Sequence, residues 1–231
     1  MSPSFALLTD IDGTLVDSNY LHIDAWSKAF ADLDAPRDTW RVHGTIGMDS
    51  TKLLETLLGD DASRLSDEAK HLHQHYYAAT APRLSSSRAP SNARRRGARE
   101  LLAEISRRGG IVVLATSAPE EELMLLRDVL DSEDAIDHVT SSEDVEQAKP
   151  EPDLVQVALD RAGVDASHAL FLGDTVWDVE AAGRADVKCI GVLSGGVSEA
   201  DLRAAGAIEV YPDVATLLRE LDSSALGKAL R

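Results

Sequence analysis

Apolar and polar positions alternate along this chain in two different ways, and the change falls near residue 90. Residues 5–8 form a short apolar run, which is typical of a buried strand in a parallel sheet. Apolar residues four apart follow, from Leu21 to Leu33, and they predict an amphipathic helix. Further helices are expected over 50–58 and 67–81. The first part of the chain is therefore predicted to be one strand followed by helices.

From Gly97 onward, short apolar runs alternate with helical patterns. Strands are expected over 111–115, 138–140, 169–172, 187–192 and 208–210. Helices are expected over 98–108, from 119, over 149–162, through 180–182, from 198 and over 213–221. Strands that alternate with helices of this length indicate right-handed βαβ units. The chain is therefore predicted to have an α/β fold built on a parallel sheet.

A stretch rich in Pro and Ser, residues 82–96, separates the two parts. This composition is typical of a linker. The stretch ends in the run Arg94–Arg96, which could attract phosphate but is more typical of a solvated surface.

The chain is strongly acidic. Its 231 residues include 40 Asp and Glu against 23 Lys and Arg, so the formal net charge is −17. Nucleic acids and anionic membranes are disfavoured as partners, because binding to their phosphates needs a basic surface. An anionic substrate would need a local positive group or a metal ion. No leader pattern or membrane-spanning apolar stretch is seen, so a cytoplasmic protein is expected. Cys189 lies in an apolar run and is predicted to be a buried thiol.

Polar side chains follow several of the predicted strands and loops, at the point where each one ends. They are Asp10, Asp12, Thr116, Ser117, Lys149, Asp174 and Asp178. Because the carboxyl ends of parallel strands meet at one edge of a sheet, these residues can converge there. Carboxylates as close as Asp10 and Asp12 repel each other, which indicates a bound metal ion, a division into acid and base, or both. Taken alone, this segment also fits a solvated Asp-Gly turn.

Three histidines, His71, His73 and His75, fall within the helix expected over 67–81. His71 and His75 would share a helix face and could hold a metal ion at i, i+4 spacing. No acidic residue at a matching spacing completes such a site, so all three are expected to be solvated.

Four segments, in this order, resemble the four motifs of the haloacid dehalogenase-like (HAD) hydrolase superfamily. They are Asp10-Ile-Asp12-Gly-Thr-Leu-Val-Asp17, Thr116-Ser117, Lys149-Pro150 and Gly173-Asp-Thr-Val-Trp-Asp178. The resemblance spans residues 5–221 and implies a Rossmann-like parallel-sheet core, residues 1–16 and 91–231. It also implies an inserted α-helical cap, residues 17–90, similar to that of the small-cap, phosphoglycolate phosphatase-like subclass.

The resemblance implies a Mg²⁺-dependent phosphatase of a small phosphorylated metabolite. Asp10 would be the nucleophile that forms an aspartyl-phosphate. Asp12 would be the general acid and base, a role that requires a pKa nearer neutrality than that of a free Asp. Mg²⁺ would be held by Asp10, by the backbone carbonyl of Asp12 and by Asp174, an all-oxygen set that suits magnesium.

The resemblance also assigns the remaining residues of the four motifs. Thr116, the Ser117 amide and Lys149 would hold the phosphoryl oxygens and offset their charge. Asp178 would position a metal-bound water or Lys149. The chain departs from the family in one place: relatives usually have Pro-Gly before the helix that precedes the second strand, and residues 95–98 read Arg-Arg-Gly-Ala.

Other functions on the same fold remain open. A 2-haloacid dehalogenase would need neither a metal nor an acid at Asp12, and a phosphomutase would need a cap that binds the far end of a sugar. A phosphonate hydrolase would need a cap lysine to form a Schiff base, and nothing selects one. A non-catalytic binding or regulatory module is the alternative outside enzymology. In the cap, Arg41, His43 and Lys52 are candidate substrate contacts, although solvation is expected for each. The substrate and the oligomeric state are left open.

Overall fold

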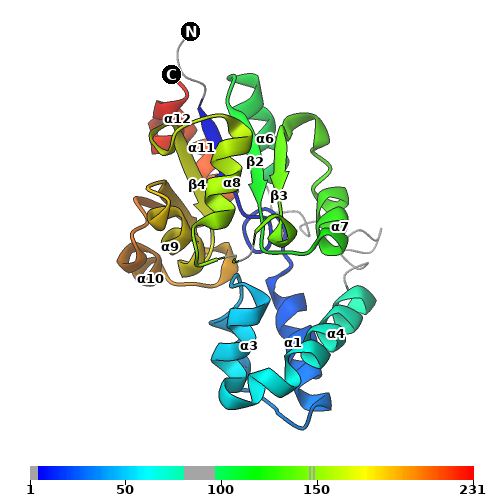
Figure 1. Ribbon diagram of the computed structural model, residues 1–231. Helices are drawn as coiled ribbons and strands as arrows, with labels where there is room; N and C mark the ends of the chain where they lie inside the picture. Colours follow the sequence, from blue (N-terminus) through cyan, green and yellow to red (C-terminus); the bar gives the residue numbers. More distant parts are fainter. Residues whose placement is uncertain (1–4, 81–96, 146, 148) are drawn as a thin grey trace.

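A single parallel sheet organises the molecule. The computed structural model describes residues 5–80, 97–145, 147 and 149–231 (Figure 1). Its strands are β1 (Ala6–Thr9), β2 (Ile111–Ala115), β3 (His138–Thr140), β4 (Ala169–Gly173), β5 (Lys188–Val192) and β6 (Glu209–Tyr211). Every neighbouring pair is parallel, and the order is β3-β2-β1-β4-β5-β6. β1 is therefore central, with Leu7 paired to Val112 on one side and to Leu170 on the other.

Helices connect the strands and cover both faces of the sheet. Between β1 and the linker lie α1 (Asn19–Asp32), α2 (Thr39–His43), α3 (Ser50–Leu58) and α4 (Ala62–Thr80). The remaining helices are α6 (Ala98–Arg107), α7 (Glu120–Leu130), α8 (Asp153–Ala162), α9 (Val176–Arg184), α10 (Glu199–Ala205), α11 (Val214–Arg219) and α12 (Ala225–Ala229). The α/β fold with a Rossmann-like parallel sheet is therefore confirmed.

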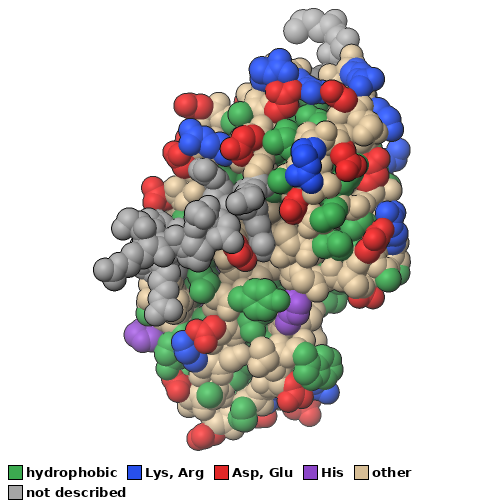
Figure 2. Space-filling model, turned by 180° about the vertical axis from the view of Figure 1, so that it is seen from behind, with side chains coloured by type: hydrophobic (Ala, Val, Ile, Leu, Met, Phe, Trp, Pro, Cys, Tyr) green, Lys and Arg blue, Asp and Glu red, His purple; other side chains and the backbone are tan. Residues whose placement is uncertain are grey.

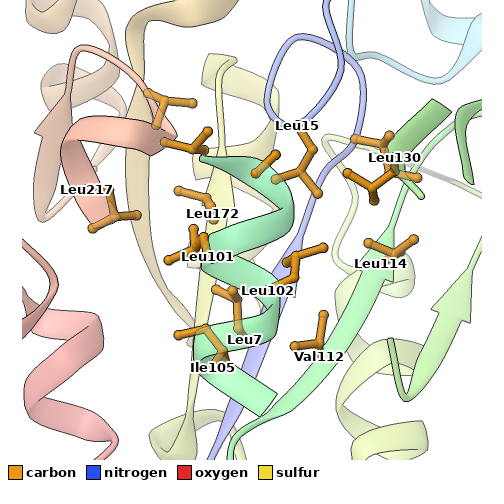
Figure 3. Close-up of a cluster of buried hydrophobic side chains, with 14 of the residues drawn as sticks. Leu7, Leu15, Leu101, Leu102, Ile105, Val112, Leu114, Leu130, Leu172 and Leu217 are labelled. Carbon is orange, nitrogen blue, oxygen red and sulfur yellow. The ribbon is translucent and has the colours of Figure 1, made fainter. Parts of the chain in front are cut away.

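Two apolar layers, one on each face, hold the sheet. On one face, Leu101, Leu102 and Ile105 of α6 pack toward Leu7 and Val112 (Figure 3). On the other face, apolar residues of α8, α9 and α10 pack on the alternate side chains of the strands, because successive strand residues point to opposite faces. All four residues of β1 are fully buried, so the segment that follows β1 starts from a rigid position.

Helices α1, α3 and α4 lie together beyond the sheet, at the lower end of the view in Figure 1. They have an apolar cluster of their own, centred on Trp26, Phe30 and Leu54. The predicted division into core and cap at residues 16 and 91 stays a prediction, because the second boundary and the linker over 82–96, with its arginine run, fall outside the described residues.

The predicted elements agree with the structure except at several helix ends. The helix expected from 149 begins at Asp153, because prolines at 150 and 152 cannot donate the backbone hydrogen bonds of a helix interior. α4 begins at Ala62 rather than 67, and the short helices α2 and α12 were not predicted. Cys189 is buried, as predicted.

The surface is mixed in charge. Acidic and basic side chains are interspersed on the face shown in Figure 2, and the basic ones do not gather into one patch there. Within the described residues, no helix combines the length and the apolar character that crossing a membrane requires.

Candidate active site

The loop after β1 places Asp10 at the carboxyl edge of the sheet. The Asp10 amide donates to the Leu172 carbonyl at 3.0 Å, so the chain is still tied to β4 at this point. Gly13 then turns the chain with a φ of +75°, a conformation that favours glycine. A Cβ at Gly13 would also stand 2.4 Å from Asp174 Oδ2, so the absence of a side chain lets this loop approach β4 closely.

Lys149 lies between two carboxylates at this edge. Its Nζ is 2.6 Å from Asp10 Oδ1 and 2.8 Å from Asp178 Oδ1, and its side chain is 1% exposed. Burial would lower the pKa of Lys149, but the two carboxylates outweigh it and the pKa is raised. Burial raises the pKa of Asp10, and the charge of Lys149 offsets this only in part. The lysine is therefore a permanent positive charge that orients the Asp10 carboxylate.

Asp174 follows β4 and is completely buried. Its Oδ1 accepts a hydrogen bond from Thr14 at 2.6 Å, and its Oδ2 accepts one from the Asn19 amide at 3.0 Å. Burial, together with the charge of Asp178, raises the pKa of Asp174 to about 7. A Cβ at Gly195 would stand 1.7 Å from Asp174 Oδ2, so this glycine leaves the space that the carboxylate fills.

Asp178 lies in the first turn of α9 and has a structural role there. Its Oδ2 accepts from the Thr175 amide at 3.0 Å, and the Asp178 amide donates to the Thr175 hydroxyl oxygen at 3.2 Å; these two bonds form a capping box. Its other oxygen faces Lys149. A second carboxylate thus fixes the ammonium group that contacts Asp10.

Carboxylate oxygens of Asp10, Asp174 and Asp178 all lie within 4.8 Å of one another. This all-oxygen set suits a hard divalent cation such as Mg²⁺. The raised pKa values of Asp10 and Asp174 have the same causes, which are burial and the charge of neighbouring carboxylates. Three buried carboxylates lie beside one ammonium group, so the site has an excess of negative charge that a bound cation would offset. The residues present therefore fit a metal ion.

Asp12 makes contacts that the sequence did not predict. Its Oδ1 accepts a hydrogen bond from the Ser18 hydroxyl and lies 3.3 Å from His22 Nε2. Burial acts to raise the pKa of Asp12, but the hydrogen bonds and charge of these neighbours outweigh it, so the pKa is lowered. The expectation that this pKa lies nearer neutrality is therefore wrong, because the two partners stabilise the ionised form.

Thr116 and Ser117 follow β2, beside the Asp10 loop. The Thr116 hydroxyl accepts from the Ala118 amide at 3.0 Å, which fixes the turn. The buried Ser117 hydroxyl has no hydrogen-bond partner among the described residues. Both residues line the same cavity as Asp10 and Asp12. The structure thus brings all seven predicted residues to the same edge of the sheet.

The cavity has a volume of about 290 Å³ and lies between the sheet edge and the helices α1, α3 and α4. Apolar side chains from those helices and the loop between α2 and α3 form one wall; they are Trp26, Ile46, Met48 and Leu53. Polar side chains of His22, His73 and Glu122 also line it. The volume is close to the lower end of the usual range of ligand pockets, about 300–1,000 Å³.

His73 corrects the prediction that the three histidines of α4 are solvated. His71 and His75 are exposed, but His73 is 8% exposed and stacks on Trp26 at 4.1 Å. Its Nε2 lies 3.2 Å from His22 Nδ1. A signal was present in the sequence, because Ala69, His73 and Tyr77 lie four apart on one helix face.

The three cap residues named as candidate contacts lie outside the cavity lining. Arg41 is exposed and lies over the Trp40 ring. His43 Nε2 is 2.9 Å from the Gly195 carbonyl, and Lys52 pairs with Glu151. His43 and Lys52 therefore join the helical part to the sheet part.

Comparison with known proteins decides the family. The model of the haloacid dehalogenase-like hydrolases matches residues 6–186, most of the chain. The chain belongs to this family. A phosphoglycolate phosphatase of Rhodospirillum rubrum is 31% identical over 220 residues, 92% of this chain and 88% of the relative. The validoxylamine A 7'-phosphate phosphatase of Streptomyces hygroscopicus is 24% identical over 81% of this chain and 84% of its own.

Solved structures agree with this HAD assignment. A hydrolase from Pseudomonas syringae is 29% identical, with a TM-score of 0.86 over 96% of this chain and 100% of that one. The predicted family and fold are confirmed, and so is the predicted enzyme class, a phosphoric monoester hydrolase.

Proposed function

We propose that this HAD hydrolase is a Mg²⁺-dependent phosphatase that cleaves a small phosphorylated metabolite through an aspartyl-phosphate on Asp10. The observation that carries the proposal is the meeting of Asp10, Lys149 and Asp174, because Asp10 also lines a ligand-sized cavity. The relatives named as phosphatases, phosphoglycolate phosphatase among them, support a small phosphate ester as substrate.

The first step is an attack by an Asp10 oxygen on phosphorus. The bond from phosphorus to the ester oxygen breaks, and the leaving oxygen takes a proton from Asp12. Asp12 then accepts a proton from water, and that water attacks the phosphorus of the aspartyl-phosphate. Inorganic phosphate leaves, and Asp10 is restored. The lowered pKa of Asp12 suits the second step, in which Asp12 acts as the base; in the first step, only the protonated fraction of Asp12 can supply the leaving oxygen with its proton.

Lys149, Thr116 and Ser117 hold the phosphoryl group in this proposal. Lys149 contributes a fixed positive charge next to the nucleophile, because both its carboxylate partners keep it in place. The partnerless Ser117 hydroxyl at the cavity wall is free to donate to a phosphoryl oxygen, in addition to its backbone amide. Asp178 positions Lys149 rather than the substrate.

Asp10, the Asp12 carbonyl and Asp174 would hold Mg²⁺, which supplies charge neutralisation and orientation of the phosphoryl group. Thr14 and Asn19 keep the Asp174 carboxylate in place through hydrogen bonds. Residues 17–90 act as a cap in this proposal: their helices close the cavity, exclude water and contact the leaving group.

The test is turnover of p-nitrophenyl phosphate with and without Mg²⁺. Wild type should release phosphate only with the metal present, and Asp10→Asn should reduce release to background while the fold persists. Asp153→Asn is the matched control, since Asp153 is exposed on α8. Turnover retained by D10N would show that another group is the nucleophile. Absence of turnover by wild type with any phosphate ester would favour a binding module.

A further inference from the structure

Glu122 is a buried carboxylate in the cavity, and no donor among the described residues satisfies it. It lies in the first turn of α7, is 8% exposed and lines the cavity together with Asp12. Its Oε1 lies 4.0 Å from His73 Nδ1, which is beyond hydrogen-bond distance. No donor among the described residues reaches either carboxylate oxygen. Buried polar groups without a partner are rare, and they often mark the place of a ligand.

The groups that face Glu122 offset its charge only in part. Burial lowers the pKa of His73 well below its usual value, so this ring is neutral. Tyr77, on the same face of α4, is neutral because burial raises its pKa. Burial also raises the pKa of Glu122 to about 7; His22 acts against this shift, and Asp12 and Glu121 add to it. At neutral pH the side chain carries partial negative charge and remains an acceptor.

The residues proposed to bind the phosphoryl group are Thr116, Ser117 and Lys149. Glu122 lines the same cavity as Thr116 and Ser117 without belonging to that set, so its carboxylate is available to the leaving group. An alcohol that carries further hydroxyl groups can donate to Glu122, and its carbon chain can pack on the apolar wall. A carboxylate in the same place would repel Glu122 and would find few cations. Lys149 is already enclosed by Asp10 and Asp178. Lys70 is the other lysine at the cavity, and its Nζ donates to Thr51 Oγ1 at 3.0 Å.

We propose that Glu122 determines specificity by accepting a hydrogen bond from a hydroxyl of the leaving group. The enzyme then prefers phosphate esters of polyols and sugars to esters whose leaving group carries a carboxylate. This inference rests on the proposed function, since it concerns the substrate of the same site. Phosphoglycolate belongs to the disfavoured class.

The test compares glycerol 3-phosphate with 3-phosphoglycerate, which differ by a hydroxymethyl group in place of a carboxylate. We expect kcat/KM with Mg²⁺ to favour glycerol 3-phosphate by about tenfold or more, the size expected for a hydrogen bond to a charged acceptor. Glu122→Gln should reduce this ratio by about tenfold, by slowing the first substrate and speeding the second. Glu120→Gln makes the same change at an exposed position of the same turn and should leave the ratio unchanged.

A second readout uses wild type alone. Both substrates share the same phosphate chemistry, so the dependence of their ratio on pH reports the groups that face the leaving group, Glu122 and His22. As the pH rises, Glu122 gains negative charge and His22 loses positive charge, and both changes disfavour a carboxylate. The preference for glycerol 3-phosphate should increase as the pH rises through about 7, because the carboxylate becomes fully charged. This readout does not depend on the folding of a variant.

Three results would overturn the proposal while leaving the phosphatase function intact. They are a wild-type preference for 3-phosphoglycerate, a ratio that E122Q does not change, and a ratio independent of pH. Selective loss of 3-phosphoglycerate turnover in Lys70→Gln would assign the leaving-group contact to Lys70 instead. Failure of the proposed function itself looks different: wild type would then cleave neither substrate nor p-nitrophenyl phosphate.

Discussion

Replacing Glu122 by glutamine should remove a pH-dependent destabilisation of the fold. The carboxyl is 8% exposed, and burial raises its pKa from 4.5 to about 7. The folded protein therefore binds this proton more tightly than the unfolded chain does. As the pH rises from the unfolded pKa through the folded one, the folded state loses stability relative to the unfolded state.

The magnitude follows from the two pKa values. Between about pH 5.5 and about pH 8.5, linkage gives a loss of about 2 kcal/mol in the unfolding free energy of wild type. The variant has no titrating group at this position, so its stability relative to wild type should improve by that amount over the same range. Asp10 and Asp174 titrate in both proteins, and their contributions cancel. His22 loses an attraction to Glu122 in the variant, which acts in the same direction.

The assay is urea unfolding followed by circular dichroism, with wild type and E122Q compared at several pH values in a chelator. Comparing differences at each pH removes every pH-independent cost of the new amide. E120Q is the control and should track wild type throughout, since its side chain is exposed. If the difference in unfolding free energy between E122Q and wild type did not change with pH, Glu122 would already be ionised at the acid end of the range. That result would contradict the assignment of Glu122 as an unsatisfied buried carboxylate.

Two further predictions concern the catalytic end of the cavity. Asp12→Ala should slow both formation and hydrolysis of the phospho-enzyme, and an unchanged single-turnover rate would remove Asp12 from the mechanism. Gly195→Ala should weaken Mg²⁺ binding by about 10–100-fold in a calorimetric titration, because its Cβ would displace the Asp174 carboxylate. Gly183→Ala is the control, since a Cβ there meets nothing within 4 Å; equal affinities in the two variants would refute the argument.

The catalytic end of the site could be predicted because its residues follow strands. A buried parallel strand is a short apolar run, and the carboxyl ends of such strands share one edge. Asp10 and Asp174 are therefore brought together by topology alone, over a sequence separation of 164 residues. Lys149 lies beyond the end of β3, and its place in the site was predicted from the resemblance to the family. At the departure from the family pattern, the backbone itself requires a glycine. The φ of Gly97 is +83°, and a Cβ there would stand 2.7 Å from Ala215 Cα. This chain therefore has the glycine of the family's Pro-Gly pair without the proline.

The other end of the cavity could not be predicted, because its polar residues lie on helices. A histidine or glutamate on an amphipathic helix is expected to face solvent unless the element that packs over it is known. His73 is buried against Trp26 of α1, and Glu122 is buried beside His73 at the junction of α4 and α7. These contacts join residues about 50 positions apart on helices whose packing no periodicity reveals. The lowered pKa of Asp12 was missed for the same reason, since it depends on His22 of α1.

The proposed metal dependence and the proposed choice of leaving group follow from one electrostatic condition. At the sheet edge, Lys149 contacts Asp10 and Asp178, and no other ammonium group of the described residues contacts the three buried carboxylates, so a phosphoryl dianion adds to an existing excess of negative charge. A divalent cation offsets that excess at the phosphoryl end. At Glu122 the neighbouring His73 is neutral, and His22 offsets the carboxylate only in part. A neutral leaving group that donates hydrogen bonds is therefore the one that this cavity can bind without a second cation.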